Sequence, residues 1–244
     1  MTGTPTPQQV FDLLDRTWPA LRMIGDGPWT LREGAGGGQR VSAATARSTV
    51  TDADIDRAEA GMRGLGQRPL FMVRPEDGPL DAWLDTRGYE VVDPVHIYAA
   101  RTESLARDLK PTLAYPVWPP VAAEREIWAE GGIGPARLAI MERATCPRVS
   151  ILARSGNRPA AAVYVGAEGG LAMLHALETR ASERRKGVGR TLVHAAANWA
   201  RETGAAWLTL AVTRANEAAN ALYADVGMTV ITGYHYRRAP KAGA

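Results

Sequence analysis

Apolar positions recur at helical spacing along one stretch in the C-terminal part of the chain. They fall three or four residues apart and follow a pair of glycines, which predicts an amphipathic helix beginning close to Gly189. These apolar positions are Val188, Leu192, Ala195, Ala196 and Trp199. Short apolar segments at 171–179 and 207–213 flank this helix and predict strands. The pattern therefore predicts the order strand, turn, helix, strand.

Similar patterns predict an alternation of helices and strands along the rest of the chain. Three antiparallel strands joined by short turns are expected at 148–154, 159–165 and 171–179. The earlier part of the chain is expected to form helix 7–17, strand 29–33, helix 52–65, strand 70–73, helix 80–86 and strand 89–98. A length of 244 residues suits one large domain or two modest ones, and this order of elements indicates an α/β (α+β) fold.

A basic run with two glycines, Arg184-Arg-Lys-Gly-Val-Gly189, directly precedes the helical pattern. The start of a helix has free backbone N–H groups and the positive end of the helix dipole, and both favour an anion. Glycine also lets the backbone approach a phosphate closely. Three cations beside the positive end of a dipole are unfavourable by themselves. A bound diphosphate accounts for them, whereas the alternative of a solvated basic turn does not.

A second motif begins 27 positions after Gly189. Its residues are Asn216, Ala219, Leu222, Tyr223, Gly227 and Met228. The basic glycine loop and this motif, in this order and at this distance, resemble the GNAT superfamily of acyl-CoA-dependent N-acetyltransferases. The resemblance is close over 172–236 and looser back to Pro116. It implies the GNAT fold, a mixed and mostly antiparallel sheet flanked by helices.

The resemblance implies acetyl-CoA (coenzyme A) as the co-substrate, with its pyrophosphate on the glycine loop. Arg184, Gly187 and Gly189 match the positions of the family's loop motif, and backbone N–H groups at the start of the helix are the expected donors. The expected pyrophosphate-binding residues are Arg184, Arg185, Lys186, Gly187, Val188, Gly189 and Arg190.

Further cofactor contacts are expected on either side of this loop. In the family, the strand before the loop separates from its neighbour, here over 174–179. The resemblance therefore implies that Leu177 and Thr179 contact the pantetheine arm through their backbone. Asn216 matches a residue that commonly contacts this arm. Asn216 can also cap the following helix, and both roles are compatible.

Amide formation from a thioester needs a proton for the leaving sulfur and a base for the amine. The resemblance implies that Tyr223 is the general acid, with ordinary packing as the alternative. Strand alternation predicts that His175 shares a face with Leu177, whereas Glu178 lies on the opposite face. His175 is the first candidate for the base because the unperturbed pKa of histidine is suitable, and a structural role is its alternative. Glu178 is the second candidate if a bulge changes the alternation, and His235 is the third.

Segments 88–98 and 227–236 of the chain resemble each other, and their glycines, Gly88 and Gly227, are 139 positions apart, as are their histidines, His96 and His235. At this offset glycine matches glycine and histidine matches histidine, whereas Leu84 falls opposite Tyr223. The first half is therefore interpreted as a degenerate copy of the second, which lacks the cofactor loop and the counterpart of Tyr223. This predicts two tandem domains: a degenerate GNAT-like domain at 1–105 and a catalytic GNAT domain at 106–244. An unrelated α/β cap domain is the alternative for the first.

Aromatic residues before the predicted sheet are candidates for the wall of an acceptor site, because the family forms this wall from the corresponding segment. They are Tyr115, Trp118 and Trp128. Packing between domains is the alternative for each. No two histidines or carboxylates show metal-ligand spacing, so no metal is expected.

Composition argues against several other classes of protein. The net charge is only +3 and no basic run is interleaved with aromatic residues, so a nucleic-acid partner is not expected. The single cysteine, Cys146, fits a reducing compartment. No signal segment or membrane-length apolar run is present, so we expect a cytoplasmic protein without a membrane partner. A monomer or a homodimer is expected.

The sequence thus indicates an N-acetyltransferase that moves an acetyl group from acetyl-CoA to a primary amine of a small molecule. The expected mechanism is direct attack in a ternary complex. Two alternatives stay open. One is a non-catalytic acyl-CoA-binding regulatory module, which would bind the cofactor without turnover. The other is acetylation of protein N-termini or lysines, which an open or acidic groove would favour.

Overall fold

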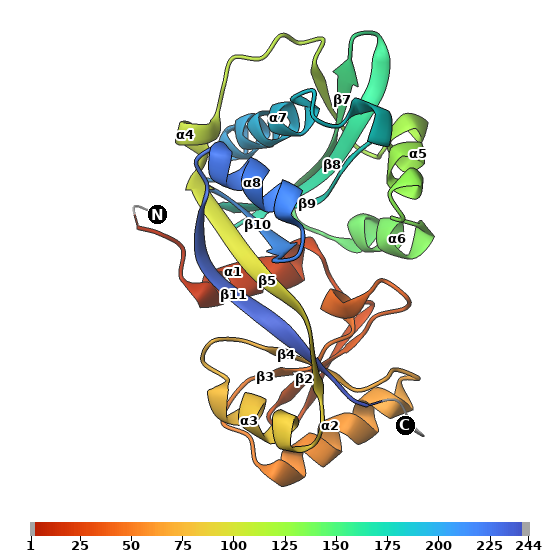
Figure 1. Ribbon diagram of the computed structural model, residues 1–244, viewed down its shortest axis with the longest axis vertical. Helices are drawn as coiled ribbons and strands as arrows, with labels where there is room; N and C mark the ends of the chain where they lie inside the picture. Colours follow the sequence, from red (N-terminus) through yellow and green to blue (C-terminus); the bar gives the residue numbers. More distant parts are fainter. Residues whose placement is uncertain (1–2, 241–244) are drawn as a thin grey trace. The chain divides into compact units, whose positions relative to one another are not determined.

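The computed structural model describes residues 3–240, which form two compact units (Figure 1). Unit 1 contains the described residues up to Pro19, together with Ile97–Val212 and Asn216–Ile231. Unit 2 contains Ala20–His96, Thr213–Ala215 and the described residues from Thr232 onward. Unit 1 includes the first helix and the end of a strand that both precede residue 105, so the compact units divide the chain in another way than the predicted repeat does, and the domain boundary at 105/106 stays a prediction.

The sheet of unit 1 is mixed and mostly antiparallel, as predicted. Its strands follow the order β5-β10-β9-β8-β7-β6. The pairs β6–β7, β7–β8 and β8–β9 are antiparallel, and β9–β10 is parallel. The bounds are β5 Glu90–Arg101, β6 Ala114–Val117, β7 Arg148–Ser155, β8 Arg158–Glu168, β9 Leu171–Thr179 and β10 Trp207–Thr213. The strands expected from apolar patterning at 148–154, 159–165, 171–179 and 207–213 are therefore confirmed.

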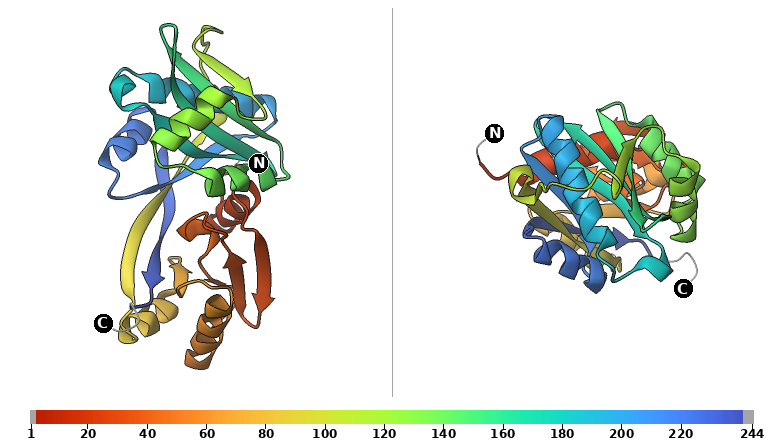
Figure 2. Two further views of the ribbon diagram at one scale, coloured as in Figure 1. Left: turned by 90° about the vertical axis from the view of Figure 1, so that its right-hand side faces the viewer. Right: turned by 90° about the horizontal axis from the view of Figure 1, so that it is seen from above.

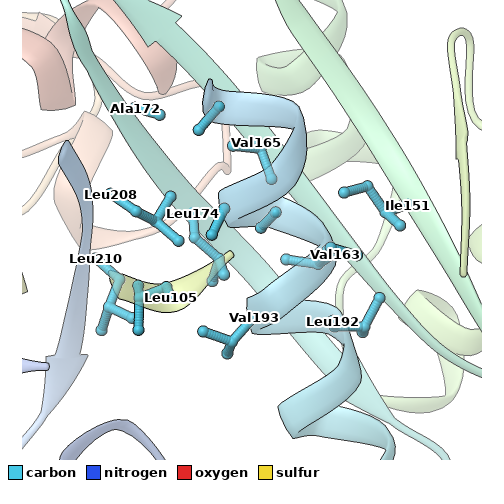
Figure 3. Packing of buried hydrophobic residues seen from close by; sticks show 14 of the residues in the cluster. Leu105, Ile151, Val163, Val165, Ala172, Leu174, Leu192, Val193, Leu208 and Leu210 are labelled. Carbon is cyan, nitrogen blue, oxygen red and sulfur yellow. The ribbon is translucent and has the colours of Figure 1, made fainter. Parts of the chain in front are cut away.

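Helices cover both faces of this sheet. The long helix α7 packs against β7, β8 and β9 through an apolar stripe, and Figure 3 shows its side chains packed against Val163, Val165 and Leu174. Each fully buried side chain of this size contributes roughly 1.5–3 kcal/mol to folding. The helices of unit 1 are α1 Pro7–Thr17, α4 Thr102–Leu105, α5 Ala122–Glu130, α6 Pro135–Arg143, α7 Val188–Glu202 and α8 Glu217–Asp225.

The opposite face of the sheet is covered by α1 and α5, which both contact β8 and β9. Figure 2 shows α5 and α6, in green, over the strands of unit 1. Helix α1 begins with a capping box at Thr6 and Gln9, followed by proline in its first turn. Within residues 3–240, no helix has both the length and the apolar character needed to cross a bilayer.

Unit 2 contains a three-stranded antiparallel sheet and two longer helices. Its apolar core includes the fully buried side chains of Trp29, Ile55, Phe71 and Leu84. Strand β4 pairs antiparallel with the C-terminal part of β11. The elements are β1 Arg22–Asp26, β2 Trp29–Glu33, the short 3-10 turn Gln39–Val41, β3 Thr45–Ala46, α2 Asp52–Gly64, β4 Leu70–Val73, α3 Gly78–Thr86 and β11 Thr229–Arg238.

The predicted internal repeat has a structural counterpart at the same offset of 139 positions. Helix α3 spans 78–86 and α8 spans 217–225. Two residues beyond the end of each helix lies a glycine with positive φ, Gly88 at 75° and Gly227 at 91°. The next residue donates its N–H to Leu84 O (2.9 Å) after α3, and to Tyr223 O (3.0 Å) after α8. Equivalent positions thus end their helices with the same cap, which supports interpreting the first half as a copy of the second.

The last strand of each copy lies beside a strand of the other copy. In unit 1, the neighbour of β10 is β5, which follows α3 in the first half of the chain. In unit 2, the neighbour of β4 is β11, which follows α8 in the second half. The repeat therefore has exchanged terminal strands, which no local pattern in the sequence predicted.

Candidate active site

The parallel strands β9 and β10 diverge in the middle of the unit 1 sheet. They pair from Leu171↔Trp207 to Leu174↔Leu210, although β9 continues to Thr179 and β10 to Thr213. Beyond Leu174, the backbone of β9 on this side no longer pairs with β10. The separation expected over 174–179 is therefore present. It leaves N–H and C=O groups of β9 available to an extended ligand.

A β-bulge marks the point where the two strands separate. His175 lies opposite Tyr164 and Glu178 lies opposite Ala162, so β9 has one residue more than β8 over this interval. Ala176 supplies it, with a φ of 51° that non-glycine residues rarely adopt. The indole N–H of Trp128 donates to Ala176 O at 2.8 Å. A buried tryptophan on α5 thus holds a strained backbone in place, and such strain is typical of functional sites.

The bulge changes which side chains of β9 share a face. Because it adds one residue after His175, Glu178 now points to the same face as His175. Leu177 turns to the other face and packs with the apolar cluster of α7. The prediction that His175 and Leu177 share a face was therefore wrong. The extra residue reverses the alternation, which is the condition under which Glu178 becomes a candidate base.

His175 is buried and held by the end of α1. Its Nε2 lies 2.8 Å from Thr17 Oγ1, and the Thr17 hydroxyl also lies 2.8 Å from Leu13 O. The carbonyl can only accept, so the Thr17 proton goes to Leu13 and the Thr17 oxygen accepts from His175. His175 therefore carries its proton on Nε2 when neutral. Trp18 stacks on the imidazole with 5.0 Å between ring centroids.

Glu178 connects the bulged strand to the basic glycine loop. Its carboxylate pairs with Arg184 at 3.2 Å, and the guanidinium of Arg184 also donates to Thr179 O at 3.2 Å. The arginine side chain is 61% exposed, so this ion pair stabilises the fold by at most about 1 kcal/mol. Its effect is to hold Arg184, the first residue of the loop motif, against the end of β9.

The loop ends at the start of α7 with a cluster of free N–H groups. Gly187 adopts a left-handed conformation with φ 81°, and Arg185, two residues earlier, has φ 64°. Thr191 donates to Gly187 O at 3.0 Å as the helix begins, so the N–H groups of the first three helical residues point outward. A Cβ added at Gly189 would lie 3.2 Å from Leu222, so this position suits glycine. The loop therefore has the donors and the close approach that a diphosphate requires.

Carboxylates already pair with most of the basic side chains of this loop. Lys186 lies 3.1 Å from Glu183, and Arg190 contacts Asp225 of α8. These side chains are about half exposed, so salt screens the pairs and an anionic ligand can compete for the cations. The backbone N–H groups are the fixed part of the site and the cations are its adaptable part.

Helix α8 presents the two remaining residues of the second motif. Asn216 caps it, with its side-chain oxygen accepting from Ala219 N at 3.1 Å, so the capping role is present. Tyr223 is buried in the α7 cluster, together with Leu177 and Val212 from the two diverging strands. Burial raises the pKa of Tyr223, which keeps the phenol protonated at neutral pH. Tyr223 thus lies on the α7 side of the sheet, opposite to the face of His175.

The three aromatic candidates for the acceptor wall have different surroundings. Tyr115 is exposed and its hydroxyl accepts from Arg154 at 3.1 Å. Trp118 is half-buried, with the Arg148 guanidinium 4.7 Å from its ring centroid. Trp128 is fully buried, and its indole N–H bonds to Ala176 O within unit 1. The structure brings Trp118 to the face of His175, through Tyr164 between them.

A buried carboxyl on the same face was not identified from the sequence. Glu124 of α5 is fully buried, and its Oε2 lies 2.9 Å from both Ser150 Oγ and Val121 N. The Ser150 hydroxyl has one proton to donate, and Val117 O, a second possible acceptor, lies 2.8 Å from Ser150 Oγ. If Ser150 donates to this carbonyl, a protonated Glu124 can donate to Ser150. Burial raises the pKa of Glu124 to about 7, which agrees with this arrangement.

Other residues of this face were also missed, for a common reason. Their partners are distant in the sequence, as with Thr17 and His175, so no local spacing indicates them. The missed residues are Thr17, Trp18, Glu124, Arg148, Ser150 and Tyr164. The third candidate base, His235, lies in unit 2 and pairs with Asp81 at 2.8 Å. In residues 3–240, no group of three or more potential metal ligands is assembled.

Comparison with known proteins identifies the part of the chain that carries this site. Residues 114–228 match the family model described as "Acetyltransferase (GNAT) family". No curated protein matches the chain. Among solved structures, a GCN5-related N-acetyltransferase from Kribbella flavida is similar at a TM-score of 0.71 and 18% identity. That match covers 96% of this chain and 95% of the other.

Two other solved structures are similar over most of both chains. A functionally unknown conserved protein from Staphylococcus epidermidis has a TM-score of 0.67 at 11% identity, covering 92% of this chain and 96% of its own. A tandem GNAT protein from the clavulanic acid biosynthesis pathway has a TM-score of 0.61 at 13% identity, covering 99% and 91%. At these identities the likeness concerns the fold. The predicted GNAT fold is confirmed, and the tandem relative agrees with two GNAT-like halves.

Proposed function

We propose that the protein transfers an acetyl group from acetyl-CoA to a primary amine, and the match of residues 114–228 to the GNAT acetyltransferase family model supports this proposal. The observation that carries this proposal is the divergence of β9 and β10 beside the N-terminus of α7. The free backbone of β9 suits an extended amide-bearing arm, and the N–H groups of α7 suit a diphosphate. Coenzyme A has both features, and its thioester supplies the activated acetyl group.

The site residues fit a direct transfer in which each has one role. Backbone N–H groups of β9 beyond Leu174 polarise the thioester carbonyl. The amine nitrogen attacks the carbonyl carbon, forming the C–N bond as the C–S bond breaks. His175 takes the proton that the amine loses, at Nδ1, because Thr17 fixes the other proton on Nε2. Tyr223 donates its proton to the departing sulfur.

The two faces of the sheet separate the acid from the base. Tyr223 belongs to the cluster on the α7 side, whereas His175 points to the side of α1 and α5. A thioester lying between the separated strands would therefore meet the acid from one face and the amine from the other. Glu178 is the second candidate base, because the bulge places it on the face of His175.

Acetyl-CoA binding is tested by calorimetry on the wild type and on two matched variants. Gly187 and Gly204 lie at the two ends of α7, with φ of 81° and 83°, and neither has an atom within 4 Å of an added Cβ. Gly187→Trp and Gly204→Trp therefore carry the same backbone strain, on the order of 1–2 kcal/mol. We expect micromolar binding to the wild type and to Gly204→Trp, and loss of binding in Gly187→Trp.

Two outcomes would overturn parts of the proposal. Absence of acetyl-CoA binding by the folded wild type would overturn it entirely. Equal loss of binding in both variants would remove the loop from the site. Binding without transfer to any amine in a screen would instead support the non-catalytic acyl-CoA-binding alternative.

A further inference from the structure

The two faces of the unit 1 sheet differ in their buried side chains. Toward α7, the central strands present Ile151, Val163, Val165 and Leu174. On the other face, Ser150, Tyr164 and His175 are in register across β7, β8 and β9, and all three are buried. A row of buried polar groups across one face is more than packing requires. The row runs across the strands from Ser150 to His175, which lies at the point where β9 and β10 separate.

Two hydrogen-bond donors beside this row are buried without a partner in residues 3–240. The Tyr164 side chain is fully buried, and its hydroxyl has no hydrogen bond within the described chain. The Nε of Arg148 is likewise buried and unpaired. Within residues 3–240, the hydrogen bond recorded for the Arg148 side chain is a long one to Cys146 O at 3.4 Å, and no ion pair is recorded for it. Leaving such donors unsatisfied is costly, so the arrangement suits a further acceptor.

The two donors come from neighbouring strands and lie on the same face. Ser150 pairs with Tyr164, and Arg148 pairs with Gly166, so Arg148 and Tyr164 are diagonal neighbours. Trp118 lies beside both, 4.7 Å from the Arg148 guanidinium and 5.8 Å from the Tyr164 ring. Burial raises the pKa of Tyr164, and the Arg148 charge acts against this rise, so the two groups sense each other. The phenol is protonated at neutral pH and donates.

A guanidinium and a phenol offer donors, and the ligand must provide acceptor oxygens. A carboxylate accepts from both at once, and it supplies the negative charge that Arg148 lacks within the described chain. We propose that Arg148 and Tyr164 bind a carboxylate of the acceptor, so that the substrate is an amine carrying a carboxylate. This inference rests on the proposed function, because the amine must reach His175 and the diverging strands.

The pairing registers separate Arg148 from His175 in two directions. Ser150 is the residue of β7 in register with His175, so Arg148 lies two strand spacings across the sheet and two residues along it from His175. These displacements, roughly 9–10 Å and about 7 Å, place the two Cα atoms roughly 12 Å apart. The inferred substrate class is a compound that carries both an amine and a carboxylate, with Trp118 beside the carboxylate. Amino acids are the simplest compounds of this class.

The experiment compares each amino acid with its carboxamide, which keeps the amine and removes the charge. The probes are β-alanine with β-alaninamide and L-leucine with L-leucinamide. They are measured both by acetyl transfer and by calorimetric binding to the enzyme in the presence of coenzyme A. Charge-assisted hydrogen bonds predict a preference of about 10- to 100-fold for the carboxylate member of at least one pair.

Variants of the two donors should remove this preference. Arg148→Gln keeps much of the side chain and removes the charge, and we expect the carboxylate preference to fall to about 2-fold. Tyr164→Phe keeps the ring and should lower the preference by about 5- to 10-fold. Arg101→Gln is the matched control, because Arg101 also lies over a tryptophan, 5.4 Å from the Trp207 ring centroid. It should keep the wild-type preference.

The possible results separate this inference from the proposed function. Transfer to amides and carboxylates with equal efficiency overturns the carboxylate site and leaves the transferase proposal intact. Equal binding of both members of each pair, or binding of neither, also overturns it. A carboxylate preference in binding that Arg148→Gln removes, without any transfer, supports the site and overturns the transferase proposal.

Discussion

Thr17 and His175 are 158 positions apart in the chain and are joined by a hydrogen bond of 2.8 Å. The bond connects the end of α1 to the strand β9 at its bulge. Because Thr17 gives its own proton to Leu13, the bond determines which imidazole nitrogen carries hydrogen. An N-terminal helix outside the family-matched segment 114–228 thus positions the candidate base.

Replacing Thr17 should impair transfer without impairing acetyl-CoA binding. Thr17→Val keeps the shape and removes the acceptor of His175 Nε2–H, so the imidazole loses its fixed tautomer. We expect kcat/KM to fall by roughly 10-fold and its pH dependence to shift. Calorimetric binding of acetyl-CoA should be unchanged. Thr17→Ser restores the hydroxyl and should recover most of the rate; a Ser variant as slow as Val would remove Thr17 from this positioning role.

Removing the hydroxyl of Tyr223 should affect the rate of transfer more than the fold. Tyr223→Phe keeps the buried ring and removes the proton donor, so we expect kcat to fall by roughly 10²- to 10⁴-fold. The control is Tyr98→Phe, whose ring lies 5.8 Å from that of Tyr223 and whose hydroxyl bonds to Asn220. It should stay within a few-fold of wild type. Steady-state kinetics on both variants checks this, and equal rates for the two would exclude Tyr223 as the acid.

Glu124 should make the stability of the protein decrease as the pH rises. Folding raises the pKa of this carboxyl from 4.5 to about 7, so the folded state binds its proton more strongly than the unfolded state does. The contribution of Glu124 to the free energy of unfolding is fully present at a pH below 4.5, and it is lost as the pH rises through 7. Glu124→Gln stays neutral, so it should be more stable than wild type at pH 8, by about 2 kcal/mol, and similar at pH 5.

Urea denaturation at pH 5 and pH 8 measures this effect. The control is Glu130→Gln on the same helix, where the exposed carboxylate pairs with Arg180 at 3.1 Å. The free energies of unfolding of this control and of the wild type should change with pH in parallel. A Glu124→Gln variant that loses stability at both pH values would mean that Glu124 is ionised in the folded state.

Tyr164→Phe should stabilise the protein while weakening the inferred carboxylate site. The Tyr164 hydroxyl is buried without a partner in the described chain, so its removal relieves an unpaired polar group. We expect the free energy of unfolding to increase by about 1 kcal/mol in the absence of ligand. Thermal unfolding with and without β-alanine provides the measurement. A loss of about 1 kcal/mol or more would show that the hydroxyl already has a partner, such as a buried water.

The sequence analysis identified the features that local chemistry determines. The glycine loop at the start of α7, the strands β7 to β10 and the helix of Tyr223 follow from patterns within a few residues of each other. The bulge was not predicted, because alanine at position 176 gives no sign of a positive φ. What holds Ala176 is the indole of Trp128, 48 positions away. The reversed alternation of Leu177 and Glu178 follows from the bulge, and this distant contact accompanies it.

The unexpected place of α1 has the same origin. Its amphipathic pattern predicted a helix, which is confirmed, but the pattern could not indicate which sheet it covers. The boundary at 105/106 came from a repeat along the chain, whereas a compact unit is defined by contacts in space. Exchanged terminal strands make these two divisions differ.

A fragment comprising residues 106–244 should therefore fold poorly. It would lack α1, which covers β8 and β9, and β5, which pairs with the edge of β10. Unpaired strand edges favour aggregation. We expect an aggregating fragment without a cooperative thermal transition, and light scattering with circular dichroism would test this. A soluble fragment with acetyl-CoA affinity equal to that of the full chain would contradict it.

The exchange of strands also bears on how such a chain can evolve. A duplicated domain with its own complete sheet can be lost by deletion once its active site decays. Here the first copy supplies the strand next to β10, so deleting it would damage the copy that retains the loop and the tyrosine. The first half can then lose its cofactor loop while selection still preserves β5. An inactive copy is retained because the active copy needs its strand.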